Sequence, residues 1–260
     1  YDGYKSAHWS NYYTRSIAHN LITVWDPKER FSNSNKKGPA CCANDGGQKF
    51  MEIFNPTLAQ IQPGGSNALD GVVAYENQDA YTYIRGNASK AYSAEKLDQS
   101  NGFVRDIIFL RKAKFWDKPI IVIFDKIVST KNKASLTKRF LMHSVNEPLS
   151  IDGIKQGPGV HRIMQPTLVI QNGDGVVYSQ TVLPRNAVLT KTGGRSMERD
   201  FRFLVPSVDS KDYYRLEGDA LEHRFKTSLM EPLPDKAQSD SWRVEVKAPV
   251  STQVEYFLHV

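Results

Sequence analysis

Hydrophobic residues along the chain gather in short runs rich in Val, Ile, Tyr, Phe and Thr, and turn-forming residues separate the runs. Such runs are typical of β-strands, whereas the three-to-four-residue spacing that marks an amphipathic helix is scarce. The pattern predicts strands over residues 21–25, 49–54, 72–75, 81–85, 102–111, 120–128, 138–144, 167–171, 175–181, 187–191, 201–206, 222–228, 242–247 and 255–260.

Two connections between these runs carry clear turn signals. The charged segment 112–118 predicts a hairpin that pairs strands 102–111 and 120–128 at the centre of a sheet. The sequence Asn172-Gly173-Asp174-Gly175 predicts a tight hairpin turn, and residues 88–97 have room for one helical turn. Many strands at short spacing predict an all-β fold, a large antiparallel β-sandwich of stacked sheets that takes in residues 1–260 as one domain.

Composition narrows the class of protein. With 260 residues, of which 40% are hydrophobic, the chain can bury a sizeable core and is not of the disordered type. No run of about 18 apolar residues is present, so the sequence predicts no membrane helix. The 34 Lys and Arg residues exceed the 28 Asp and Glu residues by 34 − 28 = 6. This mild positive charge leaves nucleic acid, a membrane surface and an acidic polysaccharide open as partners.

The chain begins at Tyr1 without a Met and ends at Val260 inside a predicted strand, so we expect it to be part of a longer protein. The adjacent Cys41 and Cys42 favour two free thiols in a loop, because a disulfide between neighbours is strained. The sequence lacks the G-x-S-x-G, H-E-x-x-H, P-loop and C-x-x-C signatures. No two of its histidines have a spacing typical of metal ligands.

Residues 6–26 hold the densest set of chemically useful side chains. Aromatic rings stack on pyranose faces, an arginine binds a carboxylate or sulfate bidentately, and an imidazole transfers a proton or ligates a metal. The competing interpretation is structural, since a single histidine ahead of a strand is usually a surface or core group. At least one of Tyr12 and Tyr13 should pack in the core. The candidate binding residues are His8, Trp9, Tyr13, Arg15, His19 and Asn20.

Several stretches resemble one family in the same order. Residues 12–20, followed by 23–27, resemble the R-[ST]-x-A-H-N segment of heparinase II/III-type polysaccharide lyases, above all the heparinase II type. Residues 45–48 correspond to a GGQ turn of that family. Residues 81–92 are similar to its Y-x-x-G-D-A-T-x-A-Y stretch, with Asn87 in place of the usual Asp. The remaining similar stretches are 103–105, 122–127, 138–144, 182–184, 193–194, 242–246 and 257–260.

The resemblance implies a two-part lyase in which this chain is the β-sheet part and an N-terminal α/α-toroid of the same protein is the other. The family cleaves uronic-acid polysaccharides such as heparin and heparan sulfate by β-elimination. One group neutralises the uronate carboxylate, a base removes the C5 proton and an acid protonates O4. The main catalytic groups would precede Tyr1, so we expect the isolated chain to be inactive.

The resemblance also implies a zinc ion with a structural role, bound by His19 together with a His and an Asp upstream of Tyr1. Asn20 would orient the turn, and we expect His143 to be buried and hydrogen-bonded. The implied location is secreted or periplasmic, with an acidic polysaccharide as partner, no nucleic acid or membrane partner, and a homodimer left open. The alternative function is a non-catalytic carbohydrate-binding or structural β-sandwich module.

Overall fold

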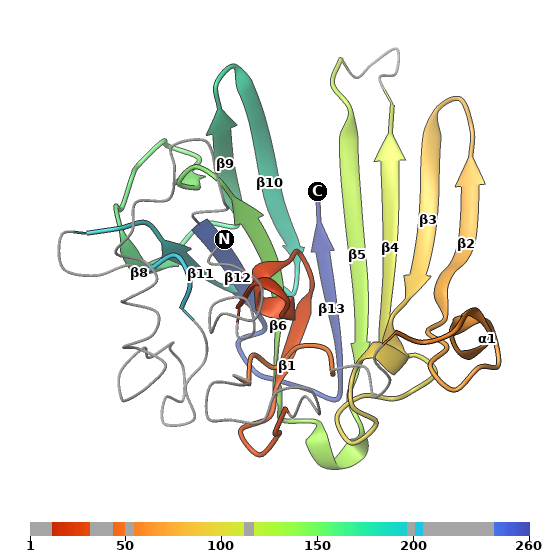
Figure 1. Cartoon of the computed structure of the whole chain (residues 1–260). Helices are drawn as coiled ribbons and strands as arrows, with labels where there is room; N and C mark the ends of the chain where they lie inside the picture. The colour runs from red at the N-terminus through yellow and green to blue at the C-terminus, as the bar shows by residue number, and fades with distance from the viewer. Residues whose placement is uncertain (1–11, 32–43, 50–54, 112–116, 197–200, 205–241) are drawn as a thin grey trace. The chain divides into compact units, whose positions relative to one another are not determined.

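The computed structural model describes residues 12–31, 44–49, 55–111, 117–196, 201–204 and 242–260 (Figure 1). These residues form mainly strands, with one short α-helix, α1 (Leu58–Ile61), and the 3-10 turns η2 (Ser16–Ala18), η3 (Ser89–Ala91) and η4 (Lys131–Lys133). The strands are β1 (Ile22–Trp25), β2 (Gly71–Asn77), β3 (Tyr81–Asn87), β4 (Phe103–Leu110), β5 (Ile120–Val128), β6 (Thr137–Ser144), β7 (Leu149–Ser150), β8 (Gly159–Ile163), β9 (Thr167–Asn172), β10 (Gly175–Leu183), β11 (Val188–Gly193), β12 (Trp242–Lys247) and β13 (Val254–His259).

The strands build two antiparallel sheets. One has five strands in the order β1-β6-β12-β11-β8, and the other has eight in the order β2-β3-β4-β5-β13-β10-β9-β7. Within the described residues neither sheet closes into a barrel. The prediction of an all-β, antiparallel chain is confirmed, and the architecture is sandwich-like.

The chain divides into two compact units, each assembled from separate segments. Unit 1 comprises Tyr1–Phe50, Arg139–Tyr178 and Val188–Lys247, and unit 2 comprises Met51–Lys138, Ser179–Ala187 and Ala248–Val260. Each unit therefore combines residues that lie far apart in the sequence, and each is described below by itself.

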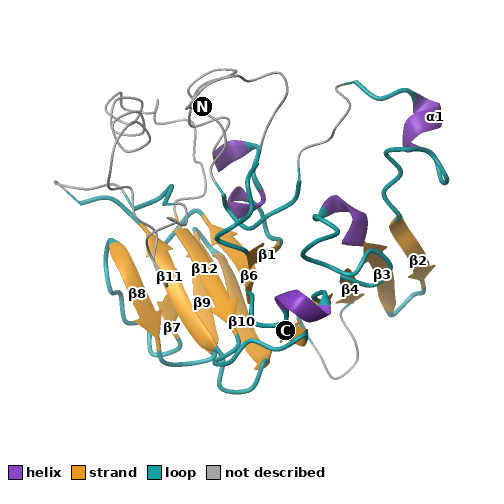
Figure 2. Cartoon of the chain, turned by 90° about the horizontal axis from the view of Figure 1, so that it is seen from below, coloured by secondary structure: helices purple, strands orange, loops and turns teal. Residues whose placement is uncertain are grey.

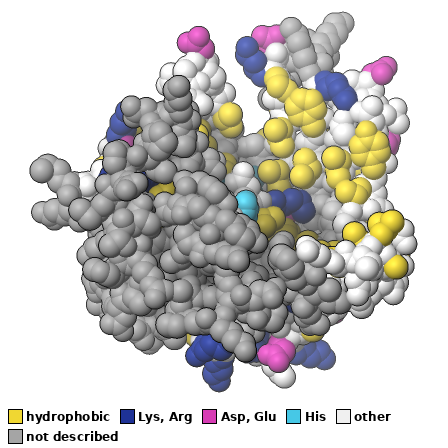
Figure 3. Space-filling model, viewed as in Figure 1, with side chains coloured by type: hydrophobic (Ala, Val, Ile, Leu, Met, Phe, Trp, Pro, Cys, Tyr) yellow, Lys and Arg dark blue, Asp and Glu magenta, His cyan; other side chains and the backbone are white. Residues whose placement is uncertain are grey.

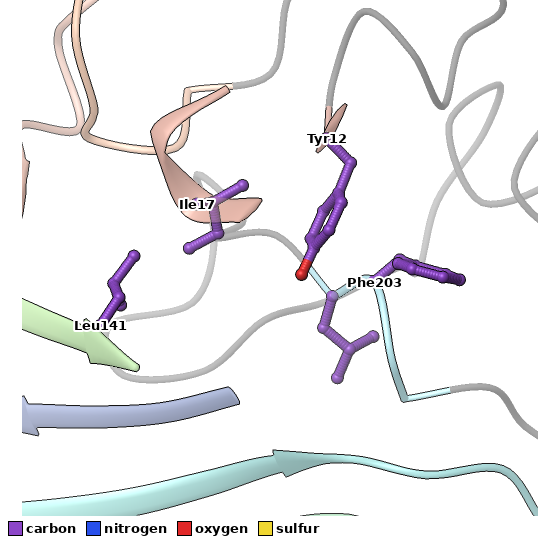
Figure 4. Close-up of a cluster of buried hydrophobic side chains, with 5 residues drawn as sticks. Tyr12, Ile17, Leu141 and Phe203 are labelled. Carbon is purple, nitrogen blue, oxygen red and sulfur yellow. The ribbon is translucent and has the colours of Figure 1, made fainter. Parts of the chain in front are cut away.

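In unit 1, strand β12 is hydrogen-bonded to β6 on one side and to β11 on the other (Figure 2). Five of its six residues are buried, as expected for a strand covered on both faces. Tyr12, Ile17, Leu141, Phe203 and Leu204 form a buried hydrophobic cluster. Figure 4 labels four of them: Tyr12 from the segment before η2, Ile17 from η2, Leu141 from β6 and Phe203 from residues 201–204. This cluster supports the turn that carries the candidate site.

In unit 2, β4 and β5 pair from Phe103↔Ile127 to Leu110↔Ile120, so the predicted central hairpin pairing is confirmed. Directly opposed residues point to the same face of a sheet. The register therefore puts Phe103 and Ile127 on one face, where both are fully or almost fully buried, together with Phe257 of β13. This face forms the core of unit 2.

The same face becomes apolar and exposed toward the β4–β5 hairpin. Register aligns Tyr75, Ile84, Ile107 and Ile123 across four strands, and Tyr75 is 64% exposed. Hydrophobic side chains gather over β2 to β5 in Figure 3. Since nothing in the structure shows what covers this apolar row, we assign it no partner.

The predicted strands agree with the structure except at a few places. Strands β7 and β8 were not predicted, because β7 has two residues and β8 follows Gly157-Pro158 and begins with a glycine. Residues 201–204 form a turn instead of the predicted strand 201–206, since Phe203 and Leu204 serve the buried cluster. The predicted strand 222–228 and residues 50–54 of strand 49–54 lie outside the described residues.

Candidate functional site

A single 3-10 turn presents the A-H-N motif of unit 1. The turn η2 comprises Ser16–Ala18, and the following residue, His19, caps it with a backbone N–H that donates to the Ser16 carbonyl oxygen at 3.1 Å. Strand β1 follows directly, and Ile22, Thr23 and Val24 are buried. His19 and Asn20 are therefore exposed residues at the junction between a tight turn and a buried strand.

A buried ion pair fixes the turn to the D-G-G-Q stretch. Arg15 Nη2 lies 2.5 Å from Asp45 Oδ1, with side chains 2% and 0% exposed. The same Oδ1 accepts the Gly47 N–H at 3.0 Å, and Oδ2 accepts the Ile17 N–H at 3.1 Å. Both carboxylate oxygens are thus used, and the guanidinium also lies over the Phe31 ring, 4.0 Å from its centroid.

The two glycines of this stretch allow its close approach to the turn. Gly46 has φ +72°, and a Cβ there would lie 2.9 Å from Trp25 Cα. A Cβ at Gly47 would lie 2.4 Å from Ser16 Cβ, and the neighbouring Gln48 N–H donates to Ser16 Oγ at 2.8 Å. A larger residue at either position would separate the two motifs.

His143 of β6 holds the other side of the turn. Its backbone N–H donates to Asn20 Oδ1 at 2.8 Å, its Nδ1 lies 3.0 Å from the same oxygen, and its Nε2 lies 3.0 Å from the Ile17 carbonyl oxygen. Burial, reinforced by the charge of Arg243, lowers the pKa of His143 to about 3, although the bond to Ile17 opposes the shift. The imidazole is therefore neutral near neutral pH and can donate to only one of the two oxygens. The hydrogen bonding predicted for His143 agrees with this geometry, and the residue is half-buried.

Arg243 of β12 connects a further motif to the same cluster. It is fully buried, and its Nε and Nη2 contact Glu245 Oε1 at 2.9 Å. Its Nη1 donates to Tyr12 Oη at 3.2 Å and its Nη2 to the Leu204 carbonyl oxygen at 3.0 Å. Arg139 contacts the second oxygen of Glu245 at 3.4 Å, so one carboxylate stands between two guanidinium groups.

The structure brings most of the predicted site residues together. Tyr13 is half-buried and packs edge-on against Tyr12 and Phe203, and its carbonyl oxygen lies 3.1 Å from His19 Nε2. Arg15 lies buried beneath them. The remaining two candidates, His8 and Trp9, lie outside the described residues, as do Cys41 and Cys42.

The described residues do not themselves supply a zinc site. Among them, no group of three or more His, Cys, Asp and Glu side chains lies close enough to hold a metal ion. His19 contributes one imidazole, and its Nε2 faces the Tyr13 carbonyl oxygen. Zinc at His19 therefore stays a prediction that depends on ligands elsewhere, and no chemical step is derived through it.

Sequence reasoning missed the contacts that unite the motifs. Asp45 and Asn20 were noted in their motifs, but neither the Arg15–Asp45 pair nor the Asn20–His143 bonds follow from local sequence, because 30 and 123 residues separate the partners. Arg243 was noted as part of a strand and of the family-like stretch 242–246, but no role was assigned to it. Its adjacency to Glu245 in the alternating pattern of β12 was the available signal.

Comparison with known proteins adds no identification. No protein-family model matches the chain, and no curated protein matches it. In the described part of the chain, no helix has the length and apolar character needed to span a membrane.

Proposed function

We propose that this chain is the β-sheet portion of a polysaccharide lyase that cleaves uronic-acid polysaccharides, such as heparin, heparan sulfate or a related glycosaminoglycan, by β-elimination. One observation carries the proposal. Four of the stretches that resemble heparinase II/III-type lyases, residues 12–20, 45–48, 138–144 and 242–246, meet in one hydrogen-bonded cluster around the exposed His19 and Asn20. Their common place in unit 1 supports the proposal that these stretches form one functional unit.

The cluster suits a part of such a site that positions the substrate, while the catalytic groups come from elsewhere in the protein. β-Elimination needs a group that neutralises the carboxylate, a base for the C5 proton and an acid for O4. At the A-H-N turn, His19 is the one exposed ionisable side chain among the described residues 12–21, so the turn alone cannot supply all these groups. The proposed catalytic tyrosine and neutralising residue therefore belong to the α/α-toroid of the same protein.

The residue roles follow from where each side chain lies. Tyr13, His19 and Asn20 reach the surface and are proposed to contact the sugar or, for His19, a structural zinc ion with upstream ligands. Arg15 was predicted to bind the substrate carboxylate. Because its guanidinium is buried against Asp45, we now propose it as a positioning residue that fixes the turn.

The rest of the proposal comes from the family resemblance. It assigns the fold more finely, as a heparinase II/III-like C-terminal domain. It also assigns the protein a secreted or periplasmic location. A homodimer stays open. The second function, a non-catalytic carbohydrate-binding or structural module, is favoured if the protein binds acidic polysaccharides without turnover.

The test of the function is a turnover assay on a panel of polymers. The full-length protein is incubated with heparin, heparan sulfate, chondroitin sulfate and alginate, and the ultraviolet absorbance of the unsaturated uronate is followed. We expect a rise on at least one polymer with the full-length protein and none with the isolated chain. Turnover by the isolated chain would overturn the assignment of the catalytic groups to upstream residues.

The zinc proposal has its own measurement. Metal content of the full-length protein is compared with that of His19→Ala, with His161→Ala of β8 as a matched histidine control. We expect less bound zinc in His19→Ala only. Equal zinc in all three proteins would remove His19 as a ligand.

A further inference from the structure

A second group of aromatic and charged side chains lies on one face of the sheet in unit 2. Register pairs Arg85 of β3 with Asp106 of β4, and Asp106 with Phe124 of β5. It also pairs Lys126 of β5 with Tyr256 of β13. Opposed residues, and residues two apart on one strand, share a face. We call this surface the lysine–tyrosine face, and it comprises Tyr83, Arg85, Asp106, Phe124, Lys126 and Tyr256.

One side of the lysine–tyrosine face is held rigid by a hydrogen-bonded triad. Asp106 Oδ1 accepts from Tyr83 Oη and from Arg85 Nε at 2.7 Å, and its Oδ2 accepts from Arg85 Nη2 at 3.1 Å. Burial alone would raise the pKa of Asp106, but the bonds from Arg85 and Tyr83 outweigh it and hold the pKa below its ordinary value. Asp106 is therefore a carboxylate. Arg85, 48% exposed, keeps Nη1 without a partner among the described residues.

The other side combines a cation with an aromatic platform. Phe124 and Tyr256 stack with ring centroids 5.7 Å apart and planes inclined by 11°, and Tyr256 is 43% exposed. Within the described part of the chain, the ammonium of Lys126 has neither a hydrogen-bond partner nor an ion-pair partner. A partly buried cation that is unneutralised and adjacent to an exposed ring can bind an anion at little cost in rearrangement.

We propose that the lysine–tyrosine face binds a sugar unit that carries a carboxylate or sulfate group, as a subsite remote in sequence from the A-H-N turn. The Tyr256 ring packs against the pyranose face, and Lys126 binds the anionic substituent. Arg85 and Lys126 are two strands apart across the sheet and two residues apart along it, which places their Cα atoms about 12 Å from each other. Arg85 therefore reaches an anionic group on a neighbouring sugar. The choice of ligand class rests on the proposed function.

Charge and surface character favour this occupant over others. The cations of Arg85 and Lys126 are matched by the carboxylates of Asp106 and Glu76, so the face carries no net positive charge, which is too little for a nucleic acid backbone. Lys126 is the cation placed beside the aromatic platform and suits a single anionic group on a sugar. Glu76, paired with Tyr83 across β2 and β3, is engaged by Tyr81 and Gln78 at the far edge. By register the apolar row of Tyr75, Ile84, Ile107 and Ile123 lies on the opposite face of these strands, whereas Ile108 and Val122 lie on the lysine–tyrosine face in line with Tyr83.

The test is titration calorimetry of the full-length protein with heparin, hyaluronan and neutral dextran. The titrations are run at low temperature so that turnover is negligible during the measurement. Lys126→Ala removes the cation, Tyr256→Ala removes the platform and Lys126→Arg preserves the charge. Lys131→Ala, an exposed lysine of η4, is the control with the same change in net charge. Comparing hyaluronan with heparin separates recognition of carboxylate from recognition of sulfate.

We expect Lys126→Ala and Tyr256→Ala each to weaken binding to an anionic polymer about five- to tenfold, and Lys126→Arg to restore most of it. Lys131→Ala should bind like wild type. Equal losses for Lys126→Ala and Lys131→Ala, or wild-type binding by Lys126→Ala and Tyr256→Ala, would overturn the proposal. Binding is measured apart from turnover, so specific losses without lyase activity would support the subsite and count against the proposed lyase.

Discussion

The buried pair between Arg15 and Asp45 gives the sharpest energetic prediction. In Asp45→Asn, an amide NH2 replaces one carboxylate oxygen while all three partners, the Arg15 guanidinium and the N–H groups of Ile17 and Gly47, are donors. At least one donor must then face another donor. The buried guanidinium of Arg15 also loses its ion pair with Asp45.

The cost follows from the exposure of the two side chains, 2% and 0%. Leaving one partner of a buried pair without its counter-ion costs about 3–5 kcal/mol, so we expect Asp45→Asn to lose about 4 kcal/mol in the free energy of unfolding. The matched control is Asp70→Asn. It breaks a pair with Lys90 whose side chains are 30% and 44% exposed and should cost at most about 1 kcal/mol.

The assay is urea unfolding followed by tryptophan fluorescence, with amide hydrogen exchange at Ile17 and Gly47 as the local probe. The double variant Arg15→Met with Asp45→Asn removes both charges of this pair, so its loss in unfolding free energy should fall short of the sum of the two single losses by about 2 kcal/mol. The reasoning is refuted if Asp45→Asn unfolds within about 1 kcal/mol of wild type, like Asp70→Asn, with unchanged exchange at Ile17.

Three further predictions test other parts of the structure. Gly46→Ala should cost about 3 kcal/mol in unfolding free energy and Gly64→Ala about 1 kcal/mol. Both glycines have positive φ, but only at Gly46 would the added Cβ lie 2.9 Å from backbone, at Trp25 Cα. Equal losses in urea denaturation would contradict this. Lys138→Met should cost about 3–5 kcal/mol in unfolding free energy, because it removes the ammonium 3.2 Å from the buried Glu255 carboxylate. The loss is measured by thermal unfolding, and the double variant Lys138→Met with Glu255→Leu should regain most of it. Burial lowers the pKa of His259 to about 4, so the unfolded chain binds a proton more readily below the ordinary value of 6.5. His259 should therefore contribute a loss of up to about 3 kcal/mol in the free energy of unfolding as the pH drops from 6.5 to 4, beside the loss from His143, whose pKa is also lowered. The unfolding free energy of His259→Asn should depend less steeply on pH than that of wild type, and an unchanged dependence would exclude His259 as a cause.

The fold could be predicted from sequence where strands are long and regular. The runs 120–128 and 242–247 match β5 and β12 at both ends, since alternating or continuously apolar residues bounded by turn signals define such strands well. Residues 201–204 show the limit of this reasoning. Their aromatic and aliphatic side chains resemble a strand but fill a cluster against Tyr12 and Ile17, a tertiary demand that local pattern does not reveal.

The candidate site could be predicted only as a set of separate motifs. The aromatic, cationic and imidazole groups of residues 12–20 were recognisable in sequence, but their burial was not. Arg15 was predicted to face a sugar, whereas Asp45 holds it inside the protein. His143 was predicted to be hydrogen-bonded, but its partner Asn20 could be found only in three dimensions, because the distance along the chain is too long for any local rule.

The most direct test of the central claim is the mass of the products released by the full-length protein from a uronic-acid polysaccharide. β-Elimination breaks the C–O bond without adding water, so the lyase account predicts oligosaccharides with an unsaturated uronate at the new non-reducing end. Each would be one water lighter than the corresponding hydrolysis product. Products that contain the added water, or intact polymer after demonstrated binding, would contradict the account.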